Sequence, residues 1–308
     1  STLMRSSAAS DVYKRQEQVF ITHGYAASIA LILHALAKPG NGMWIEDPGF
    51  PLIRPIVTRH DVEILPVPVD DNGLDITSGI QNYPDARFAL ITPAHQSPLG
   101  VALSLARRHK ILEWADRSQA WIIEDDYDSE FRYHGKPLPA LKSLDAPQRV
   151  IYAGTFSKAL FPALRCAWLV VPVKQIAQFR HQASLAPCAV PVLWQNTLAD
   201  FLREGHFWRH LKKMRQHYAQ RRQWIEQALT QQGFQVVPQK GGIQMVIRMI
   251  GDDIAHARKA NAAGLAVQAL SDWRIRSSGE GGLLLSFTNI VNEAMARQVA
   301  QQLRKALS

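Results

Sequence analysis

The chain has 308 residues, of which 47% are hydrophobic and 20% are charged, an ordinary globular composition. This composition excludes a disordered tail, a collagen-like fibre and a coiled coil, and the length suits two domains around a large core. No apolar run in the sequence reaches the roughly 18 residues that a membrane helix needs. The net charge of +9 raises the question of a nucleic-acid partner.

The densest basic stretch, residues 210–222 (HLKKMRQHYAQRR), does not have the pattern of a DNA-reading segment. Leu211, Met214 and Tyr218 recur in it at helical spacing, which predicts an amphipathic helix with a solvated basic face. The sequence also has no zinc-finger, homeodomain or RNA-recognition signature. The distribution of the basic residues therefore argues against DNA binding by this chain.

The cysteines and the first residues bear on where the protein works and where its fold begins. Cys166 and Cys188 are too few for a disulfide framework and form no CxxC pair, so we expect two reduced thiols in a cytoplasmic protein. Residues 1–16 (STLMRSSAASDVYKRQ) have no hydrophobic period and no apolar run, which excludes a signal peptide. We expect them to be a leader that is foreign to the fold.

From residue 17 onward, short apolar runs alternate with helical patterns. Strands are expected at residues 18–22, 43–47, 62–69, 88–93, 121–128, 150–157 and 166–172, and helices at 25–37, 53–59 and 104–118. This alternation is typical of βαβ units that build a mostly parallel sheet. Such sheets bind ligands beyond the carboxyl ends of their strands, so the polar residues at those ends are the candidates for a site.

The pattern changes after about residue 187. A long helical stretch is expected over residues 192–229, followed by apolar runs at 234–238, 243–249 and 283–287 and by a helix near 253–263. These elements describe a smaller α+β unit. The sequence therefore predicts a leader over residues 1–16, a large domain over 17–200 and a small C-terminal domain over 201–308.

The strand at residues 121–128 ends in a run of acids, EDDYD. Because side chains alternate along a strand, Asp125 and Tyr127 share one face while Asp126 takes the other. Acids at the end of an apolar strand are costly to bury unless a cation or a metal pairs with them. A solvated strand end is the simpler alternative, but the preceding Trp-Ile-Ile favours burial.

The segment GTFSKALFPALR, residues 154–165, places Lys158 directly after a buried strand and among apolar residues. Burial lowers the pKa of a lysine and makes its amine a better nucleophile toward a carbonyl. A lysine in such a segment, taken alone, is more often a surface residue. Lys158 becomes a candidate through its neighbours.

Polar groups around this lysine predict an anion-binding cup. Thr155 and Ser157 precede it at alternate positions, and Arg165 follows. Gly24 opens the helix at residues 25–37, and a helix N-terminus offers free N–H groups to a phosphate, although an ordinary tight turn is the simpler interpretation of one glycine. Together with the acid and the phenol above, the set suits an aldehyde with a phosphate tail and a ring nitrogen, which is pyridoxal phosphate.

Four segments carry a resemblance to a known family: EDPGFP (46–51), TPAHQSPLG (92–100), EDDYDSEFRY (124–133) and GTFSKALFPALR (154–165). They resemble the pyridoxal-phosphate fold-type-I aminotransferases and, more narrowly, the aminotransferase-like domain of MocR-type regulators of the GntR superfamily. The resemblance runs from about residue 17 to the C-terminus. It implies the fold-type-I transferase fold, a homodimer, and a fragment of a longer protein whose N-terminal winged-helix DNA-binding domain is not in this sequence.

The resemblance also assigns a role to each matching residue. Lys158 would hold the cofactor as a Schiff base, Asp125 would pair with the pyridinium nitrogen, and Tyr127 would bond to the ring oxygen O3′. The remaining positions that match cofactor contacts are Gly24, Tyr25, Ala26, Thr155, Ser157 and Arg165 in the phosphate cup, Phe50 stacked on the ring, and His95 and Gln96 beside O3′. No metal is expected.

Two departures from the family pattern bear on function. The phosphate turn usually reads Gly-Ser-Gln-Gln and here is Gly24-Tyr25-Ala26-Ala27, while residues 283–287 (LLLSF) are aliphatic where active aminotransferases carry an arginine for the substrate carboxylate. Arg274 or Arg276 is the alternative source of such a contact. The departures favour an effector domain that senses pyridoxal phosphate, an amine or an amino acid over a working class I/II aminotransferase.

A third hypothesis is a degenerate dimerisation domain that binds no cofactor, and the intact lysine, acid and phenol argue against it. For the regulator, contact with DNA is expected only through an upstream winged-helix domain. We expect no membrane partner.

Overall fold

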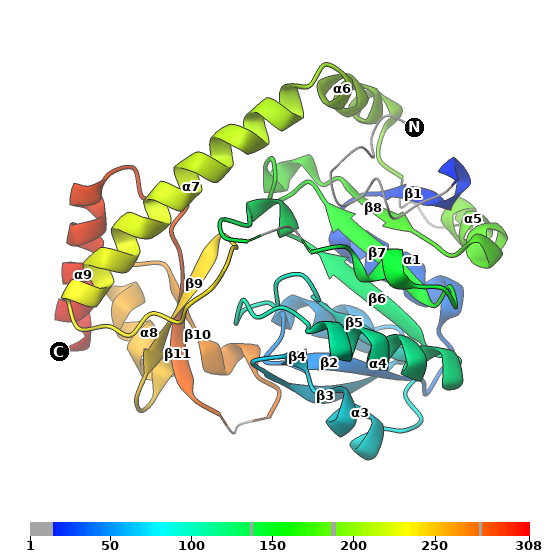
Figure 1. Cartoon of the computed structure of the whole chain (residues 1–308), viewed down its shortest axis with the longest axis horizontal. Helices are drawn as coiled ribbons and strands as arrows, with labels where there is room; N and C mark the ends of the chain where they lie inside the picture. Colours follow the sequence, from blue (N-terminus) through cyan, green and yellow to red (C-terminus); the bar gives the residue numbers. More distant parts are fainter. Residues whose placement is uncertain (1–14, 136–137, 186–188, 277–278) are drawn as a thin grey trace.

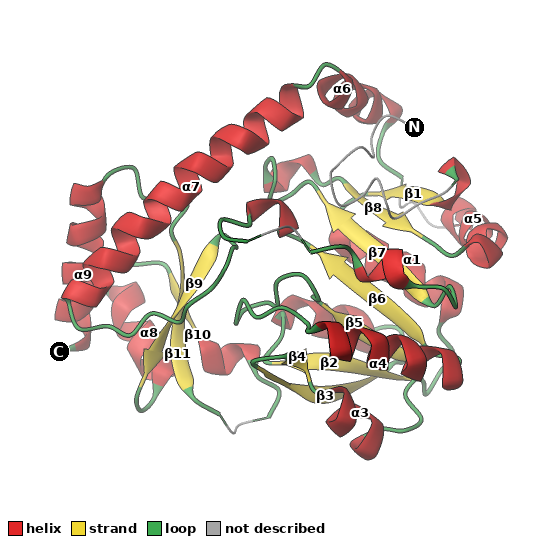
Figure 2. Cartoon of the chain, in the orientation of Figure 1, coloured by secondary structure: helices red, strands yellow, loops and turns green. Residues whose placement is uncertain are grey.

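The computed structural model describes residues 15–135, 138–185, 189–276 and 279–308. Within these ranges, an eight-stranded sheet with helices on both faces forms one part of the molecule, and a three-stranded sheet with its own helices forms the other (Figure 1, Figure 2). The expected fold class, a mostly parallel α/β sheet with a smaller α+β unit, is confirmed. Nearly all of the expected leader, and Cys188, lie outside the described residues.

The large sheet has the strand order β1-β8-β7-β6-β5-β2-β3-β4. Its strands are β1 (Val19–Thr22), β2 (Gly42–Asp47), β3 (Glu63–Asp70), β4 (Gly73–Leu74), β5 (Phe88–Ile91), β6 (Trp121–Asp126), β7 (Val150–Thr155) and β8 (Ala167–Val170). β2, β3, β5, β6 and β7 run parallel, whereas β8 runs antiparallel between β1 and β7. The carboxyl ends of β1, β2, β5, β6 and β7 therefore meet at one edge, where the polar segments of the sequence were expected to gather.

Two apolar layers cover this sheet. Its helices are α1 (Tyr25–Leu36), α2 (Arg54–Thr58), α3 (Ile76–Asn82), α4 (Leu105–Arg117) and α5 (Ile176–Leu185). Side chains of α1, α2 and α5 pack in one buried cluster, and those of α3 and α4 pack in another, which includes Trp44 stacked on Trp114. Because β2, β5 and β7 are buried throughout, they appear in the sequence as continuous apolar runs.

The smaller part of the molecule follows α6 (Val192–Arg203) and the long helix α7 (His206–Gln231). Its antiparallel sheet, in the order β10-β11-β9, consists of β9 (Gln244–Met249), β10 (Val267–Ala269) and β11 (Gly281–Ser286). With α8 (Asp253–Ala262) and α9 (Glu293–Leu307), this sheet and the C-terminal half of α7 enclose a separate core. In Figure 1, α7 extends from α6, above the large sheet, to α9 beside the small one. The boundary at residue 200 stays a prediction.

Several sequence expectations are wrong in detail. The helical stretch expected over residues 192–229 is two helices, because Gly205 between them has a φ of 76° and interrupts the helical path. The run at 234–238 forms no strand and only bridges β9 through Val236 and Ile247. The strand expected to reach residue 128 ends at Asp126. β4, β10, α3, α5 and α9 were not predicted; β4 and β10 have only two and three residues, whereas α9 has buried Ala296, Ala300 and Leu303 at a helical spacing that could have been found.

The basic stretch in α7 behaves as its spacing predicts over most of its length. Leu211 is buried, Met214 and Tyr218 pack against apolar cores, and Lys212 and Lys213 are exposed. Its last member, the arginine at position 222, departs from this pattern, because its side chain is 7% exposed and donates to the Gly241 carbonyl at 2.8 Å. The interpretation of a solvated face therefore holds for the lysines and not for this arginine.

Gly154 in β7 offers a direct test of the packing. A β-carbon at this position would lie 2.3 Å from Cζ2 of Trp168 in the neighbouring strand. We expect Gly154→Ala to lower the free energy of unfolding by about 1–3 kcal/mol, the usual cost of overpacking, as measured by chemical denaturation. Trp168→Phe in the same background should recover part of this loss, because the smaller ring vacates the contested space. Additive effects of the two changes would contradict this account.

Candidate functional site

The acids at the end of β6 point in different directions. Asp126 accepts hydrogen bonds from the Tyr152 hydroxyl at 2.5 Å and from the Ser129 amide at 3.3 Å. Glu124 accepts from the amides of residues 141 and 142, at 2.6 and 2.7 Å. Asp125, between them, is buried, and its Oδ1 has no hydrogen-bond partner within the described ranges. The alternation of the strand thus separates Asp125 from both neighbouring acids.

Asp125 lies in surroundings that oppose its negative charge. Burial raises the pKa of Asp125 to about 8, and the nearby carboxylates of Asp126 and Glu46 act in the same direction. The phenol of Tyr25, from the first turn of α1, lies beside this carboxyl group. A buried acid with an unpartnered oxygen fits a cationic hydrogen-bond donor, and a protonated ring nitrogen is such a donor.

Tyr127 lies just beyond the strand and contacts the loop that follows β5. The Nδ1 atom of His95 is 3.1 Å from the Tyr127 hydroxyl oxygen and 3.1 Å from Oδ1 of Asp128. The side chain of Ser97 faces the same hydroxyl. Burial raises the pKa of Tyr127 well above its usual range, so the phenol keeps its proton. The structure therefore brings two predicted residues, His95 and Tyr127, into direct contact.

Gln96, by contrast, holds two loops together. Its amide nitrogen donates to the carbonyl oxygens of Pro48 at 2.8 Å and Ser97 at 2.7 Å. Its amide oxygen accepts from the Leu99 amide at 3.0 Å. These bonds tie the loop after β5 to the loop after β2, so the side chain of Gln96 holds the two loops in place. Of the two residues, His95 is the one that contacts Tyr127.

Three residues near this group were not predicted: Glu46, Ser97 and Asp128. Glu46 is the last residue but one of β2, is buried, and accepts from the amide and the hydroxyl of Thr92 at 3.0 and 2.6 Å. Burial raises the pKa of Glu46 to about 7. The rule that polar residues at strand ends form the site would have found Glu46 if it had been applied to β2. The roles of Ser97 and Asp128 depend on side-chain directions in loops, which the sequence does not encode visibly.

Lys158 corrects one expectation. Its side chain is exposed, not buried among apolar residues, although the nearby Phe156 and Ala159 are buried. Nearby, the Thr155 hydroxyl donates to Ser157 Oγ at 3.0 Å and accepts from the Ser157 amide at 3.1 Å. β7 is the direct neighbour of β6, with Ala153 opposite Asp125. Lys158 therefore follows the strand adjacent to the one that carries the buried acid.

The two remaining parts of the expected cup lie against each other. Gly24 precedes α1 with a φ of 85°, and within the described residues no side chain caps this helix. A β-carbon on Gly24 would lie 3.1 Å from Cζ of Arg165, so the guanidinium packs directly on this turn. Ala26 lies in the first turn of the same helix. A helix N-terminus beside an arginine fits an anion such as a phosphate group.

The other candidates lie farther toward the small sheet. Phe50 packs against Trp273, with ring centroids 5.9 Å apart, beside a buried cluster that contains Leu284 of the LLLSF segment. Arg274 donates to the Glu280 carbonyl at 2.8 Å, and Arg276 donates to the Tyr83 hydroxyl at 2.5 Å. The side chains of both arginines therefore already have protein partners.

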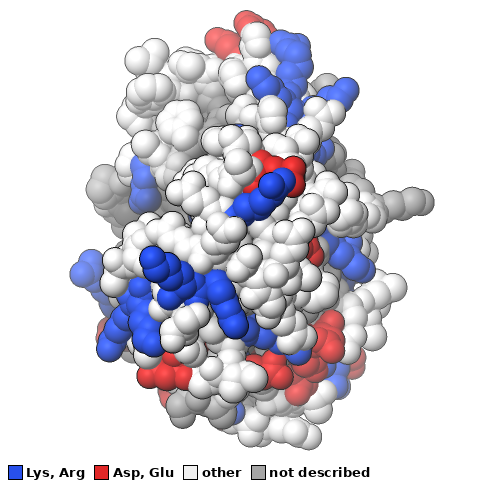
Figure 3. Space-filling view, turned by 90° about the vertical axis from the view of Figure 1, so that its left-hand side faces the viewer, with Lys and Arg blue, Asp and Glu red and all other residues white. Residues whose placement is uncertain are grey.

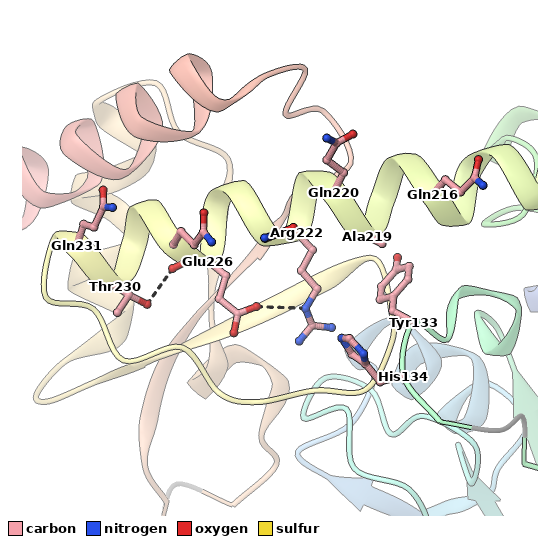
Figure 4. A pocket seen from close by; sticks show the side chains of 11 residues that line it. Tyr133, His134, Gln216, Ala219, Gln220, Arg222, Glu226, Thr230 and Gln231 are labelled. Carbon is pink, nitrogen blue, oxygen red and sulfur yellow. Dashed lines mark hydrogen bonds and ion pairs between the residues drawn. The ribbon is translucent and has the colours of Figure 1, made fainter.

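A polar groove lies elsewhere, between α7 and the segment that carries Tyr133 and His134 (Figure 4). It has a volume of about 1080 Å³, and Arg222 and Glu226 approach each other along its wall at 3.5 Å. None of the sequence-predicted site residues lines it. Among the described residues, no group of three or more His, Cys, Asp or Glu side chains is arranged to hold a metal ion.

Burial of the acids predicts how stability depends on pH in the cofactor-free protein. The folded-state pKa values of Glu46 and Asp125 are raised, to about 7 and about 8, above those of the unfolded chain. The folded state therefore binds more protons than the unfolded state between about pH 4 and pH 8, and the unfolding free energy falls as the pH rises through that window. Asp125→Asn should reduce the fall by at least about 1 kcal/mol, measured by denaturation at pH 5 and 8.5. Identical slopes in the two proteins would contradict the burial of this charge.

Comparison with known proteins agrees with this geometry. The family model described as aminotransferase class I and II matches residues 4–280. The chain therefore belongs to the class I and II aminotransferase family. Within the described residues, no helix is long and apolar enough to cross a membrane.

Several of the curated relatives found by sequence are regulators. The chain is 33% identical over 296 residues to the probable rhizopine catabolism regulatory protein MocR of Rhizobium meliloti, a match that covers 94% of this chain and 59% of that protein. It is 31% identical over 293 residues to the pyridoxine biosynthesis transcriptional regulator PdxR of Corynebacterium glutamicum, covering 95% and 63%. The chain thus spans about half to two thirds of the length of these relatives, and the resemblance to MocR-type regulators is confirmed.

Solved structures share the fold at low sequence identity. An archaeal alanine:glyoxylate aminotransferase superposes with a TM-score of 0.89 at 23% identity, covering 99% of this chain and 79% of that chain. The kynurenine aminotransferase of Pyrococcus horikoshii, solved in complex with PMP, gives a TM-score of 0.87 at 24% identity, covering 99% and 78%. These likenesses confirm the fold-type-I architecture.

Proposed function

We propose that this chain is the pyridoxal-phosphate-binding, aminotransferase-like effector domain of a transcriptional regulator. The observation that carries the proposal is Asp125, a buried carboxyl group with an unpartnered oxygen, beside a phenol and on the strand next to the one that leads to Lys158. A structural acid would have its hydrogen bonds satisfied by the protein, as Glu124 and Asp126 do. Asp125 instead presents an acceptor that a protonated pyridine nitrogen completes.

The other residues that we expect to contact the cofactor lie at the same edge of the sheet. Gly24 and Arg165 at the start of α1, with Thr155 and Ser157 after β7, would bind the phosphate group. Tyr127 would donate to the ring oxygen, and the amine of Lys158 would bond to the aldehyde carbon. When bound, pyridoxal phosphate supplies a ring that draws electrons from an attached amine. The protein's own part is to hold the ring nitrogen protonated through Asp125 and to keep the phenol in its donor form.

The regulatory part of the proposal rests on the relatives. MocR and PdxR are named as regulators, and the segments that match this chain make up 59% and 63% of them. We infer that the DNA-reading part of such a protein lies outside the matched segment and that the protein works in the cytoplasm. On the face shown in Figure 3, Lys and Arg lie in several separate groups among acidic and uncharged residues, so this face offers no single continuous basic surface to a nucleic-acid backbone.

The homodimer belongs to the same proposal. Large apolar side chains are exposed around the start of α6 and after β7, namely Phe161, Leu185, Val192, Leu193 and Trp194. Exposed clusters of this kind are typical of surfaces that a partner covers. Since the segment after β7 also carries Lys158, a second copy docked on this surface would lie close to the cofactor.

The test is a titration of the purified protein with pyridoxal phosphate, followed by visible absorbance and by borohydride trapping. We expect a saturable visible band and one trapped cofactor per chain. A protein that gives neither would contradict the proposal. Addition of amino acids then separates the second candidate, a working aminotransferase, because only an enzyme would convert the band and release a keto acid. The protein contacts that Arg274 and Arg276 already make favour the effector domain.

A further inference from the structure

His95 occupies a constrained position beside Tyr127. Its Nδ1 atom lies 3.1 Å from the Tyr127 hydroxyl oxygen and 3.1 and 3.2 Å from the two carboxyl oxygens of Asp128. The Asp128 side chain is 2% exposed and that of His95 is 12% exposed, so water does not compete strongly for these contacts. On the far side of the ring, Nε2 is buried and has no hydrogen-bond partner within the described ranges.

The small unit holds this ring in place. A β-carbon on Gly242, which has a φ of 84°, would lie 2.2 Å from Cε1 of His95, so the glycine backbone packs directly on the imidazole. The neighbouring Gln239 donates to the Pro98 carbonyl at 3.1 Å, in the same loop as His95. The imidazole is therefore held in place by its packing against Gly242 and by its contact with the Asp128 carboxyl group.

The identity of the neighbours decides where the protons lie. A carboxylate has no proton to give, so the Nδ1 atom that faces Asp128 must carry one. The Tyr127 hydroxyl, 3.1 Å from the same nitrogen, then cannot donate to it and turns its own proton elsewhere. We propose that His95, anchored by Asp128, is a positioning residue that keeps the Tyr127 hydroxyl proton directed at the ring oxygen of the cofactor; this inference rests on the proposed function.

Several groups besides His95 also face Tyr127. They are the carboxyl groups of Asp125, Asp128 and Glu46 and the hydroxyl of Ser97. Burial raises the pKa of the phenol well above its usual range, and the nearby acids act in the same direction. The phenol therefore remains a proton donor, and the N–H of His95, by occupying the Asp128 carboxylate, keeps the phenol's proton from turning toward either the imidazole or Asp128.

The first test needs no cofactor. Nitrogen-15 NMR of the histidine-labelled protein reports which ring nitrogen carries the proton, and the signal of His95 is identified by its loss in His95→Asn. We expect the tautomer protonated at Nδ1. A neutral ring protonated at Nε2 would overturn the proposal, whether or not the protein binds pyridoxal phosphate.

The second test measures the pH at which the visible absorbance of bound pyridoxal phosphate changes. His95→Leu removes the N–H group at similar bulk, whereas His95→Asn keeps an N–H near the position of Nδ1. A hydrogen bond donated to the ring oxygen stabilises negative charge there, so its loss should raise the midpoint by about one pH unit in the Leu variant. The Asn variant should stay close to the unmodified protein.

Tyr127→Phe supplies the control for the second test. In that background, His95→Leu should cause no further shift, because the hydroxyl that His95 positions is gone. A shift that persists without Tyr127, or equal shifts in the Asn and Leu variants, would overturn the proposal. If the unmodified protein shows no visible band, the proposed function fails, and the NMR result still decides the tautomer. The NMR measurement also decides the matter if the Leu variant does not fold.

Discussion

Lys158→Ala is expected to abolish the visible absorbance of bound pyridoxal phosphate and its trapping by borohydride. The amine is the group that would bond to the aldehyde carbon, and no hydroxyl of the neighbouring cup can replace it. Because the lysine side chain is exposed in the structure, its removal should leave the unfolding free energy of the protein without cofactor unchanged within about 0.5 kcal/mol. Both readouts are obtained from the same preparation, one by spectroscopy and one by denaturation.

Lys213→Ala is the matched control for this experiment. It removes an equally exposed lysine from α7, far from the end of β7 in sequence, and should leave both the band and the trapping intact. Persistent trapping in Lys158→Ala, at the level of this control, would mean that another amine holds the cofactor. The assignment of Lys158 would then be wrong.

Asp125→Ala is expected to weaken pyridoxal phosphate binding by two to three orders of magnitude. Removing one partner of a buried, hydrogen-bonded ion pair costs about 3–5 kcal/mol, and each 1.4 kcal/mol is a tenfold change in the dissociation constant. The measurement is a cofactor titration followed by absorbance. The same substitution removes a buried carboxyl group whose pKa is raised to about 8, so the stability of the cofactor-free variant should fall less with rising pH than that of the unmodified protein.

Asp126→Ala gives the contrast that makes this result specific. Its carboxylate accepts from the Tyr152 hydroxyl on the other side of the strand, so its loss should cost stability and leave the affinity for the cofactor within a few fold. Equal losses of affinity in the two variants would mean that the ring nitrogen does not lie against Asp125. The pair of variants therefore separates binding from folding.

The central strands of the large sheet could be predicted from the sequence because they are buried on both faces. Runs such as the one in β7 are continuous and apolar, and the helices between them are long enough to show their period. The same logic located the acid, the phenol and the lysine, since all three lie at or just beyond the carboxyl ends of strands that meet at one edge. The resemblance supplied their roles, which strand ends alone would not.

What the sequence could not supply depends on side-chain direction. Lys158 was expected to be buried because apolar residues surround it in the sequence, but its side chain is exposed while the nearby Phe156 and Ala159 are buried. Tyr25 was expected at the phosphate turn, and its phenol extends to Asp125. Asp128 and Ser97 lie in loops without periodicity, so their approach to His95 and Tyr127 follows only from the three-dimensional path.

The contact between residues 239–242 and the loop that carries His95 bears on the autonomy of the large unit. The Gly242 backbone packs on the imidazole of His95, and the Gly242 amide donates to the Phe131 carbonyl at 2.9 Å. The side-chain amide of Gln239 donates to the Pro98 carbonyl. A fragment cut at residue 200 would keep every lysine, acid and hydroxyl of the candidate site but would lose this cover, and the loop would face water. The two sheets share no strand, yet residues of both units surround His95, so neither unit makes a complete site alone.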